Sequence, residues 1–152
     1  MNDGRLHKIM ARKLSEKTKQ LKKERWYYWK ASQLRSNWRS RCKKVKGDID
    51  SVPTRQQIED WLNLTPLKCY LTGKEVIKSK MEVDHKRPIS NGGSYGFNNL
   101  GITSKRLNSA KGNMSEKEFK GLLKLISKWE DKGDQLLNRL IAANNVFRRR
   151  RK

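Results

Sequence analysis

The hydrophobic positions in the first third of the chain follow a helical spacing. Leu6, Ile9, Met10 and Leu14 fall three to four residues apart or next to one another, as on one face of a helix. Lys, Arg, Gln and Ala, which favour helices, occupy many of the other positions, and residues 5–46 contain neither Gly nor Pro. This pattern predicts one or two helices that end near Gly47.

Capping boxes predict the starts of two later helices. Thr54, followed three residues later by Gln57, opens a short helix that stops before Pro66. Its expected buried stripe consists of Ile58, Trp61 and Leu62. Ser115 and Glu118 form the second box. The apolar face of the helix that follows consists of Phe119, Leu122, Leu123, Ile126 and Trp129.

The stretch between the two boxes has the pattern of short strands and turns. Residues 69–77, centred on a Thr72-Gly73-Lys74 turn, predict a hairpin or ribbon. Residues 81–83 predict a further strand, and residues 86–98 are rich in Gly, Asn and Ser. A second short helix is expected to begin near residue 103 or 104. The chain is therefore predicted to belong to the α+β class.

The end of the chain is predicted to form one more helix. Gly133 separates it from the preceding one, and its apolar residues are Leu136, Leu137, Leu140 and Ile141. Residues 148–152 form a basic run that we expect to be disordered.

The chain carries a large positive charge, because 37 Lys and Arg against 15 Asp and Glu give +22 in 152 residues. Such an excess repels itself in the folded state unless a polyanion neutralises it. Residues 1–50 alone hold 16 basic against 5 acidic residues, and they include the aromatic cluster from Trp26 to Trp29. Nucleic acid is therefore the first partner to consider, and an anionic membrane surface the second.

Simpler features argue against other classes of protein. No apolar run exceeds four residues, so no segment is expected to span a bilayer. No apolar stretch follows the basic residues near the N-terminus, so no secretory signal is expected. Cys42 and Cys69 are too few for a disulfide framework. We expect reduced thiols and a cytoplasmic protein.

Four polar residues in the middle of the chain have the chemistry of a hydrolytic site. Asp84-His85 ends a predicted strand, Asn99 lies 14 residues after His85, and Asn108 lies 9 residues after Asn99. His85 can accept a proton near neutral pH, as the base that activates water in phosphodiester hydrolysis must. Asp84 and Asn108 offer hard oxygen ligands of the kind that Mg²⁺ prefers. Asn99 either fixes the loop or orients the imidazole. Five surrounding cations are expected to hold flanking phosphates: Lys86, Arg87, Lys105, Arg106 and Lys111.

These residues stand within a longer pattern between residues 67 and 118. It consists of Cys69-Tyr70-Leu71-Thr72-Gly73, Asp84-His85, Pro88, Gly92-Gly93, Asn98-Asn99-Leu100, Asn108 and Lys111-Gly112-Asn113. This pattern resembles the HNH endonuclease family. The resemblance implies a ββα-metal (His-Me finger) fold in which the Asp-His pair ends the first strand. It also implies that Asp84 and Asn108 are metal ligands, that His85 is the general base, and that Asn99 positions this base.

Two departures from the family pattern bear on the metal. Asn108 stands where many members have His. The same Asn variant is found in HNH nicking enzymes of phages and group I introns and in the HNH domains of CRISPR effectors. Loss of the imidazole ligand favours Mg²⁺ or Mn²⁺ over Zn²⁺ or Ni²⁺. Many members also carry two Cys-x-x-Cys pairs that hold a structural zinc. Here Thr72, Ser104 and Leu107 stand at three of those four positions, so no structural zinc is expected.

We therefore expect a small ββα-metal nuclease module flanked by basic helices. Residues 1–50 would form a basic, aromatic, helical DNA-binding extension, residues 51–115 the nuclease module, and residues 116–152 the C-terminal helices and basic tail. The protein is expected to hydrolyse DNA with one Mg²⁺ or Mn²⁺ ion per active site and no small-molecule cofactor. It would nick one strand per active site, as a monomer or homodimer, in a bacterial or phage-infected host cell.

Two other functions compete with this interpretation. One is a non-catalytic basic protein that binds DNA or RNA and keeps the HNH fold, which the intact Asp84, His85 and Asn108 disfavour. The other is a protein that lies on a membrane surface, for which the aromatic cluster is the only sign. Four adjacent aromatic residues point all around a helix, so we favour packing over base stacking for most of the cluster.

Overall fold

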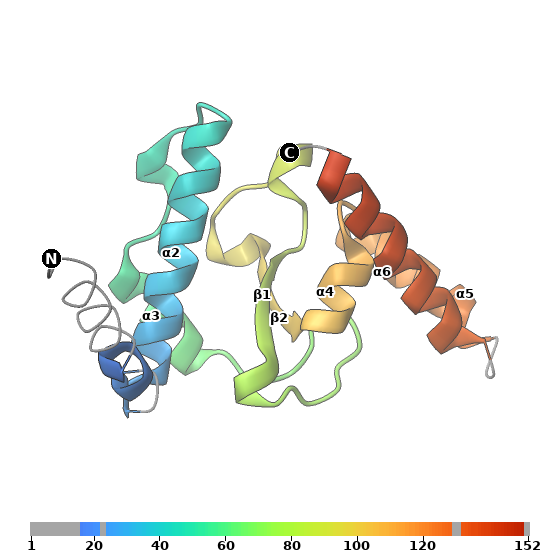
Figure 1. Cartoon of the computed structure of the whole chain (residues 1–152), viewed down its shortest axis with the longest axis horizontal. Coiled ribbons are helices and arrows are strands. Elements are labelled where there is room, and N and C mark those ends of the chain that lie inside the picture. The colour runs from blue at the N-terminus through green and yellow to red at the C-terminus, as the bar shows by residue number, and fades with distance from the viewer. Residues whose placement is uncertain (1–15, 22–23, 129–131, 151–152) are drawn as a thin grey trace, which may run out of the picture. The chain divides into compact units, whose positions relative to one another are not determined.

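A computed structural model describes residues 16–21, 24–128 and 132–150 of the chain, with side chains described as far as residue 146. Contacts divide the chain into two compact units, residues 1–64 and 65–152. Figure 1 labels their helices and strands. The helix predicted around residues 6–14 and the side chain of Trp129 lie outside the described residues.

The first unit is built from helices. Helix α2 spans Trp26–Lys44, and Ala31, Leu34, Trp38 and Cys42 form its buried stripe. Helix α3 spans Arg55–Leu64, contacts α2 and buries Ile58 and Leu62. Because α3 packs with α2, the chain divides after Leu64, whereas the sequence suggested a boundary near residue 50.

The aromatic cluster at the start of α2 is half-buried. The rings of Trp26 and Tyr27 meet edge to face, with centroids 5.3 Å apart. The guanidinium groups of Arg25 and Arg55 lie over the Tyr28 ring, 4.5 Å and 4.2 Å from its centroid. Such cation–π contacts hold Tyr28 within the first unit, in line with a packing role.

Both predicted capping boxes form. The amide of Gln57 donates to Thr54 Oγ1 at 3.3 Å, and the amide of Thr54 donates to Gln57 Oε1 at 2.9 Å. Ser115 and Glu118 exchange the same two bonds, at 3.3 Å and 2.7 Å, and open helix α5, Glu116–Ser127. These reciprocal bonds satisfy backbone donors that have no partner within the first helical turn, which fixes where each helix starts.

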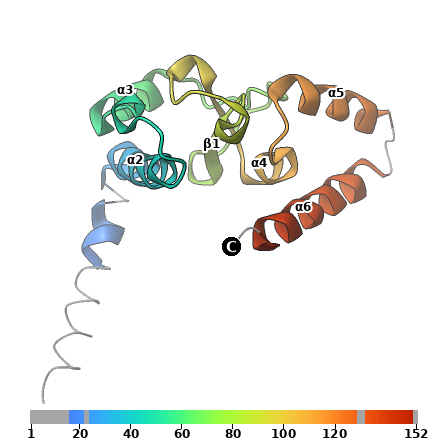
Figure 2. The ribbon, with the colours of Figure 1, turned by 90° about the horizontal axis from the view of Figure 1, so that it is seen from above.

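The described residues of the second unit form a two-stranded antiparallel sheet and three α-helices, besides short 3-10 turns. Strand β1, Met81–His85, pairs with β2, Leu100–Ser104, so that Asp84 lies opposite Gly101 and His85 opposite Leu100. Helix α4, Lys105–Lys111, follows β2 directly and contacts both strands. Helix α6, Gly133–Arg150, contacts α4 and α5, and both ribbon views show α4 beside α6 (Figures 1 and 2). The described chain is therefore mixed α+β, as predicted.

Two segments differ from the sequence prediction. Residues 67–76 form a ribbon shorter than the predicted one: Lys68 and Glu75 make an antiparallel bridge, and Cys69 N donates to Lys74 O and Val76 N to Leu67 O, each at 2.8 Å. The amide of Tyr70 also donates to Ile102 O of β2 at 2.9 Å, so this segment is bound to the sheet itself. Helix α6 continues to Arg150, so residues 148–150 are helical where the sequence predicted disorder.

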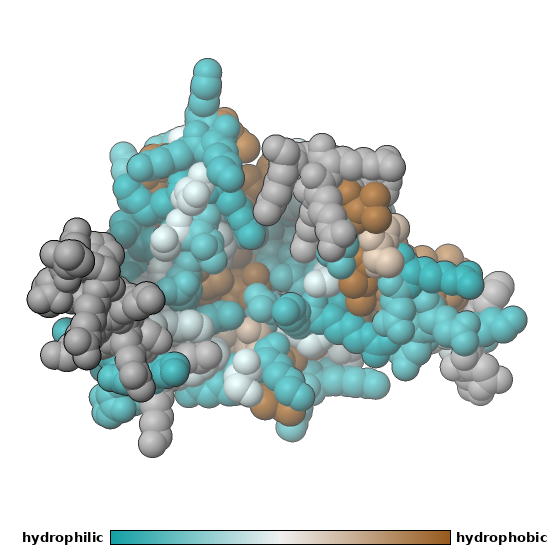
Figure 3. Space-filling model, in the orientation of Figure 1, coloured by the Kyte–Doolittle hydropathy of each residue, from teal (hydrophilic) through white to brown (hydrophobic). Residues whose placement is uncertain are grey.

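No helix among the described residues is long and apolar enough to cross a membrane. The face drawn in Figure 3 is mostly hydrophilic, with small separate apolar areas.

Gly101 offers a test of how tightly Tyr70 packs on the sheet. A Cβ at this position would lie 2.5 Å from Cδ1 of the Tyr70 ring, so Gly101→Ala must displace the ring. We expect a loss of about 1–3 kcal/mol in the free energy of unfolding, measured by urea denaturation. The control is Gly121→Ala inside α5, where a Cβ meets no atom within 4 Å. This helical glycine should tolerate Ala with a gain of up to about 1 kcal/mol. Equal stability of the two variants would contradict the packing.

Candidate active site

The carboxylate of Asp84 is held by two partners, both on its Oδ2 atom. The Tyr70 hydroxyl donates to Oδ2 at 2.5 Å, and the Lys111 ammonium forms an ion pair with it at 3.0 Å. The same ammonium donates to the carbonyl of His85 at 2.9 Å. In the described part of the chain, Oδ1 of Asp84 has no hydrogen bond or ion pair, so this oxygen remains available as a ligand.

Tyr70 is the hydrogen-bond donor in its contact with the Asp84 carboxylate. The pKa of the phenol is raised far above its ordinary value. The main cause is burial of the ring, and the second is the hydrogen bond to the negative Asp84. The hydroxyl therefore stays protonated at neutral pH. Gly101, opposite Asp84 on β2, leaves the space in which the ring lies.

Lys111 is fully buried, with 0% of its side chain exposed. This corrects the expectation that Lys111 contacts phosphate, because its ammonium is enclosed and bonded to β1. A buried ammonium requires an opposite charge and hydrogen-bond acceptors, and Asp84 and the His85 carbonyl supply both. Lys111 is the last residue of α4, so the ion pair joins the end of this helix to the end of β1.

His85 follows Asp84 but faces the other side of the sheet. Burial alternates along β1, with Met81, Val83 and His85 buried and Glu82 and Asp84 partly buried. Successive side chains of a strand point to opposite faces. The imidazole is 6% exposed and meets the Tyr95 ring edge to face, with centroids 5.4 Å apart.

Asn99 holds the loop that follows His85. Its Oδ1 accepts from the amide of Arg87 at 2.8 Å, and its Nδ2 donates to the carbonyls of Arg87 and Ser94 at 3.0 and 2.8 Å. All of these partners are backbone atoms of the loop. Of the two roles considered for Asn99, these contacts match loop fixing.

Gly92 and Gly93 lie in the same loop, at two positions that disfavour a side chain. Gly92 has a φ of 76°, a conformation that favours glycine. A Cβ at Gly93 would lie 2.0 Å from the carbonyl oxygen of Arg87.

Asn108 lies on α4 one turn before Lys111 and is partly buried. Residues three apart on a helix share a face, so Asn108 lies on the side of α4 from which Lys111 reaches Asp84. No described side-chain contact joins Asn108 to Asp84. Within the described residues, no three His, Cys, Asp or Glu side chains gather closely enough to hold a metal. A divalent ion here would depend on Asp84, the Asn108 amide, water and substrate.

The other four expected phosphate contacts lie at least partly in solvent. Lys86 Nζ donates to the Asn98 carbonyl at 3.2 Å, and Arg87 Nε donates to the Asn91 carbonyl at 2.7 Å. Both acceptors are neutral carbonyl groups, so these bonds do not compensate the positive charge of either side chain. Lys105 is exposed, whereas Arg106 forms an ion pair with Asp134 at 2.8 Å.

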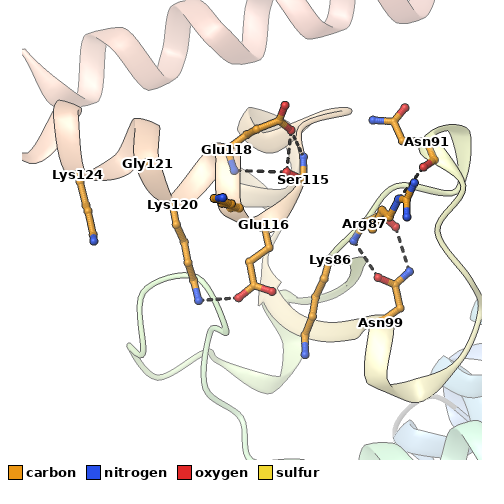
Figure 4. A pocket seen from close by; sticks show the side chains of 11 residues that line it. Lys86, Arg87, Asn91, Asn99, Ser115, Glu116, Glu118, Lys120, Gly121 and Lys124 are labelled. Carbon is orange, nitrogen blue, oxygen red and sulfur yellow. Dashed lines mark hydrogen bonds and ion pairs between the residues drawn. The ribbon is translucent and has the colours of Figure 1, made fainter.

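A pocket of about 910 Å³ lies between the loop after His85 and helix α5. The amide of Glu116, the first residue of α5, donates to the Lys86 carbonyl at 2.8 Å, which fixes the helix to the loop. Figure 4 shows Lys86, Lys120 and Lys124 extending to the same side of this pocket. The sequence interpretation missed the α5 lysines, although the spacing of Lys117, Lys120 and Lys124 would have placed them on one helix face.

Comparison with known proteins identifies no relative: no family model, curated protein or solved structure matches the chain.

The buried ion pair can be tested by unfolding. Lys111→Ala leaves the largely buried Asp84 carboxylate without its cation, so we expect the free energy of unfolding to fall by about 3–5 kcal/mol. Lys105→Ala, at the exposed start of the same helix, is the control and should change it by less than about 0.5 kcal/mol. Urea denaturation followed by circular dichroism measures both. A Lys111→Ala variant as stable as the control would show that the ion pair does not hold the unit together.

Proposed function

We propose that the chain is a metal-dependent DNA endonuclease of the HNH type, with its catalytic module in residues 67–118. The observation that carries the proposal is the ion pair by which Lys111 of α4 binds Asp84 of β1. The order of β1, β2 and α4 is the order that the ββα-metal fold requires. Asp84 near the end of β1 is bound by α4, the helix that also carries Asn108.

Asp84 and Asn108 fit a single Mg²⁺ or Mn²⁺ ion. Asp84 Oδ1 has no hydrogen bond or ion pair within the described chain, and the Asn108 amide offers a second hard oxygen. When bound, such an ion would supply positive charge against the charge that develops on the phosphate and the leaving oxygen. Lys111 and Tyr70 orient the carboxylate by holding its other oxygen.

His85 is the proposed general base. Its imidazole would take the proton of the attacking water, and the edge-to-face contact with the Tyr95 ring holds the imidazole in place. Because His85 is 6% exposed and faces the other side of the sheet from Asp84, substrate binding must open a path for water and bring the imidazole and the ion at Asp84 to the same phosphate. Asn99 positions this part of the site indirectly, by holding the loop that begins after His85.

The proposed substrate is DNA, because the chain carries +22 and exposed cations flank the site. Lys86, Arg87, Lys105 and Arg106 are the proposed contacts to phosphates next to the scissile bond. Residues 1–50, with 16 basic residues, would add affinity that does not depend on sequence.

A second candidate is a non-catalytic protein that binds DNA or RNA. The ion pair of Asp84 with Lys111 favours it, because an internal ammonium already neutralises the carboxylate. The burial of the His85 imidazole favours it as well. Such a protein would bind nucleic acid without cutting it.

Nicking of supercoiled plasmid tests the proposed function. With Mg²⁺ the protein should convert the plasmid to the open circular form, and EDTA should abolish this. His85→Ala should lower the rate by about 10²–10⁴-fold, the usual contribution of a general base. His7→Ala, which removes the only other histidine, is the matched control and should cut at the wild-type rate.

Two outcomes would count against the proposal. A His85→Ala variant that nicks at the wild-type rate removes His85 from the chemistry. Plasmid binding without any metal-dependent nicking, measured by gel shift on the same samples, supports the non-catalytic protein instead.

A further inference from the structure

The pocket between the loop after His85 and α5 has an unbalanced positive charge. Its lining contains five cations, from Lys86 and Arg87 in the loop and from three lysines of α5, against two carboxylates. The three lysines are Lys117, Lys120 and Lys124. Excess positive charge along a groove attracts a polyanion and raises its local concentration.

Both carboxylates of this lining are already engaged. Glu118 accepts from the backbone amide and the hydroxyl of Ser115, each at 2.7 Å, as part of the capping box. Glu116 forms an ion pair with Lys120 at 2.6 Å, drawn as a dashed line in Figure 4. No carboxylate of the described residues forms an ion pair with Lys117 or Lys124, and both lysines are exposed. These two charges are therefore available to a ligand.

The spacing of the two lysines suits a chain of phosphates. Lys117 and Lys124 are seven residues apart, which is about 10.5 Å along a helix at 1.5 Å per residue. One strand of a duplex advances about 3.4 Å per phosphate along its axis, so this distance corresponds to about three nucleotides. Two phosphates of one strand could therefore contact the two lysines at the same time.

This pocket, called the groove from here on, is also held in a fixed position relative to the proposed catalytic base. The Glu116 amide bonds the Lys86 carbonyl, and Lys86 directly follows His85. Asn99, which lines the same pocket, holds the loop at Arg87. A phosphate bound on α5 would therefore sit at a set distance from His85.

We propose that this groove binds the backbone of the DNA strand beside the scissile bond, with Lys117 and Lys124 as its phosphate contacts. The inference rests on the proposed function, because it assigns the groove to the substrate of that site. Phosphates bound here set which bond of the strand reaches His85, as backbone contacts fix register in other DNA-binding proteins.

The test is the salt dependence of binding to a fluorescently labelled duplex in EDTA, measured by anisotropy. Each lost phosphate contact reduces the slope of log K against log salt by about 0.9, so Lys117→Gln/Lys124→Gln should reduce it by about 1.8. The control, Lys68→Gln/Lys74→Gln, removes the same charge from exposed lysines outside the groove and should leave the slope nearly unchanged. All four lysines are exposed, and circular dichroism verifies the fold of each variant.

The outcomes separate this inference from the proposed function. EDTA prevents metal-dependent cleavage, so the slope reports on the groove even if the protein never cuts DNA. Equal slopes for the groove variant and the control variant would overturn the inference, while nicking with Mg²⁺ would still support the nuclease. Binding of polyglutamate lost only in the groove variant, with the DNA slope unchanged, would instead assign the groove to an acidic polypeptide.

Discussion

The second unit depends on one buried ammonium. Lys111 is removed from solvent; Asp84 balances its charge, and the carbonyl of His85 accepts a further hydrogen bond from it. Enclosing a charge costs several kcal/mol unless its partners are well placed, so helix α4 and strand β1 are constrained to meet at this point. Tyr70 completes the arrangement by donating to the same carboxylate oxygen.

This constraint links stability to the proposed chemistry. Because Lys111 and Tyr70 both use Oδ2, they fix the direction in which Oδ1 of Asp84 faces. The Lys111 ammonium also donates to the His85 carbonyl. The carbonyl of the next residue, Lys86, accepts from the amide of Glu116, the first residue of α5. The two residues proposed to do the chemistry and the groove proposed to hold the strand thus belong to one connected framework.

The parts of the fold that depend on local sequence could be predicted. The capping boxes at Thr54 and Ser115 formed because their partners lie only three residues apart. A short strand over residues 81–83 and a short helix that begins near residue 103 or 104 were also expected, and β1 and α4 lie there. The α+β class follows from these elements.

The parts that depend on contacts distant in sequence could not be predicted. Lys111 was expected in solvent, since no local signal distinguishes a lysine that meets a carboxylate 27 residues away. The hydrogen bond from the amide of Tyr70 to Ile102 of β2 was not expected either, because these two residues lie 32 positions apart in the sequence. The first unit extends to residue 64 because α3 packs on α2.

The most direct test of this account is the Mn²⁺ dependence of plasmid nicking by Asp84→Ala and Glu82→Ala, each verified by circular dichroism to be folded under the assay conditions. Both variants remove a carboxylate from β1, and that of Asp84 forms the ion pair with Lys111 of α4. If Asp84 holds the ion, its loss should raise the Mn²⁺ concentration for half-maximal rate by more than about tenfold, because even changes around a metal's ligands have effects of that size. Glu82→Ala should match the wild type. The same Mn²⁺ dependence in both variants, or no metal-dependent nicking by the wild type, would contradict the account.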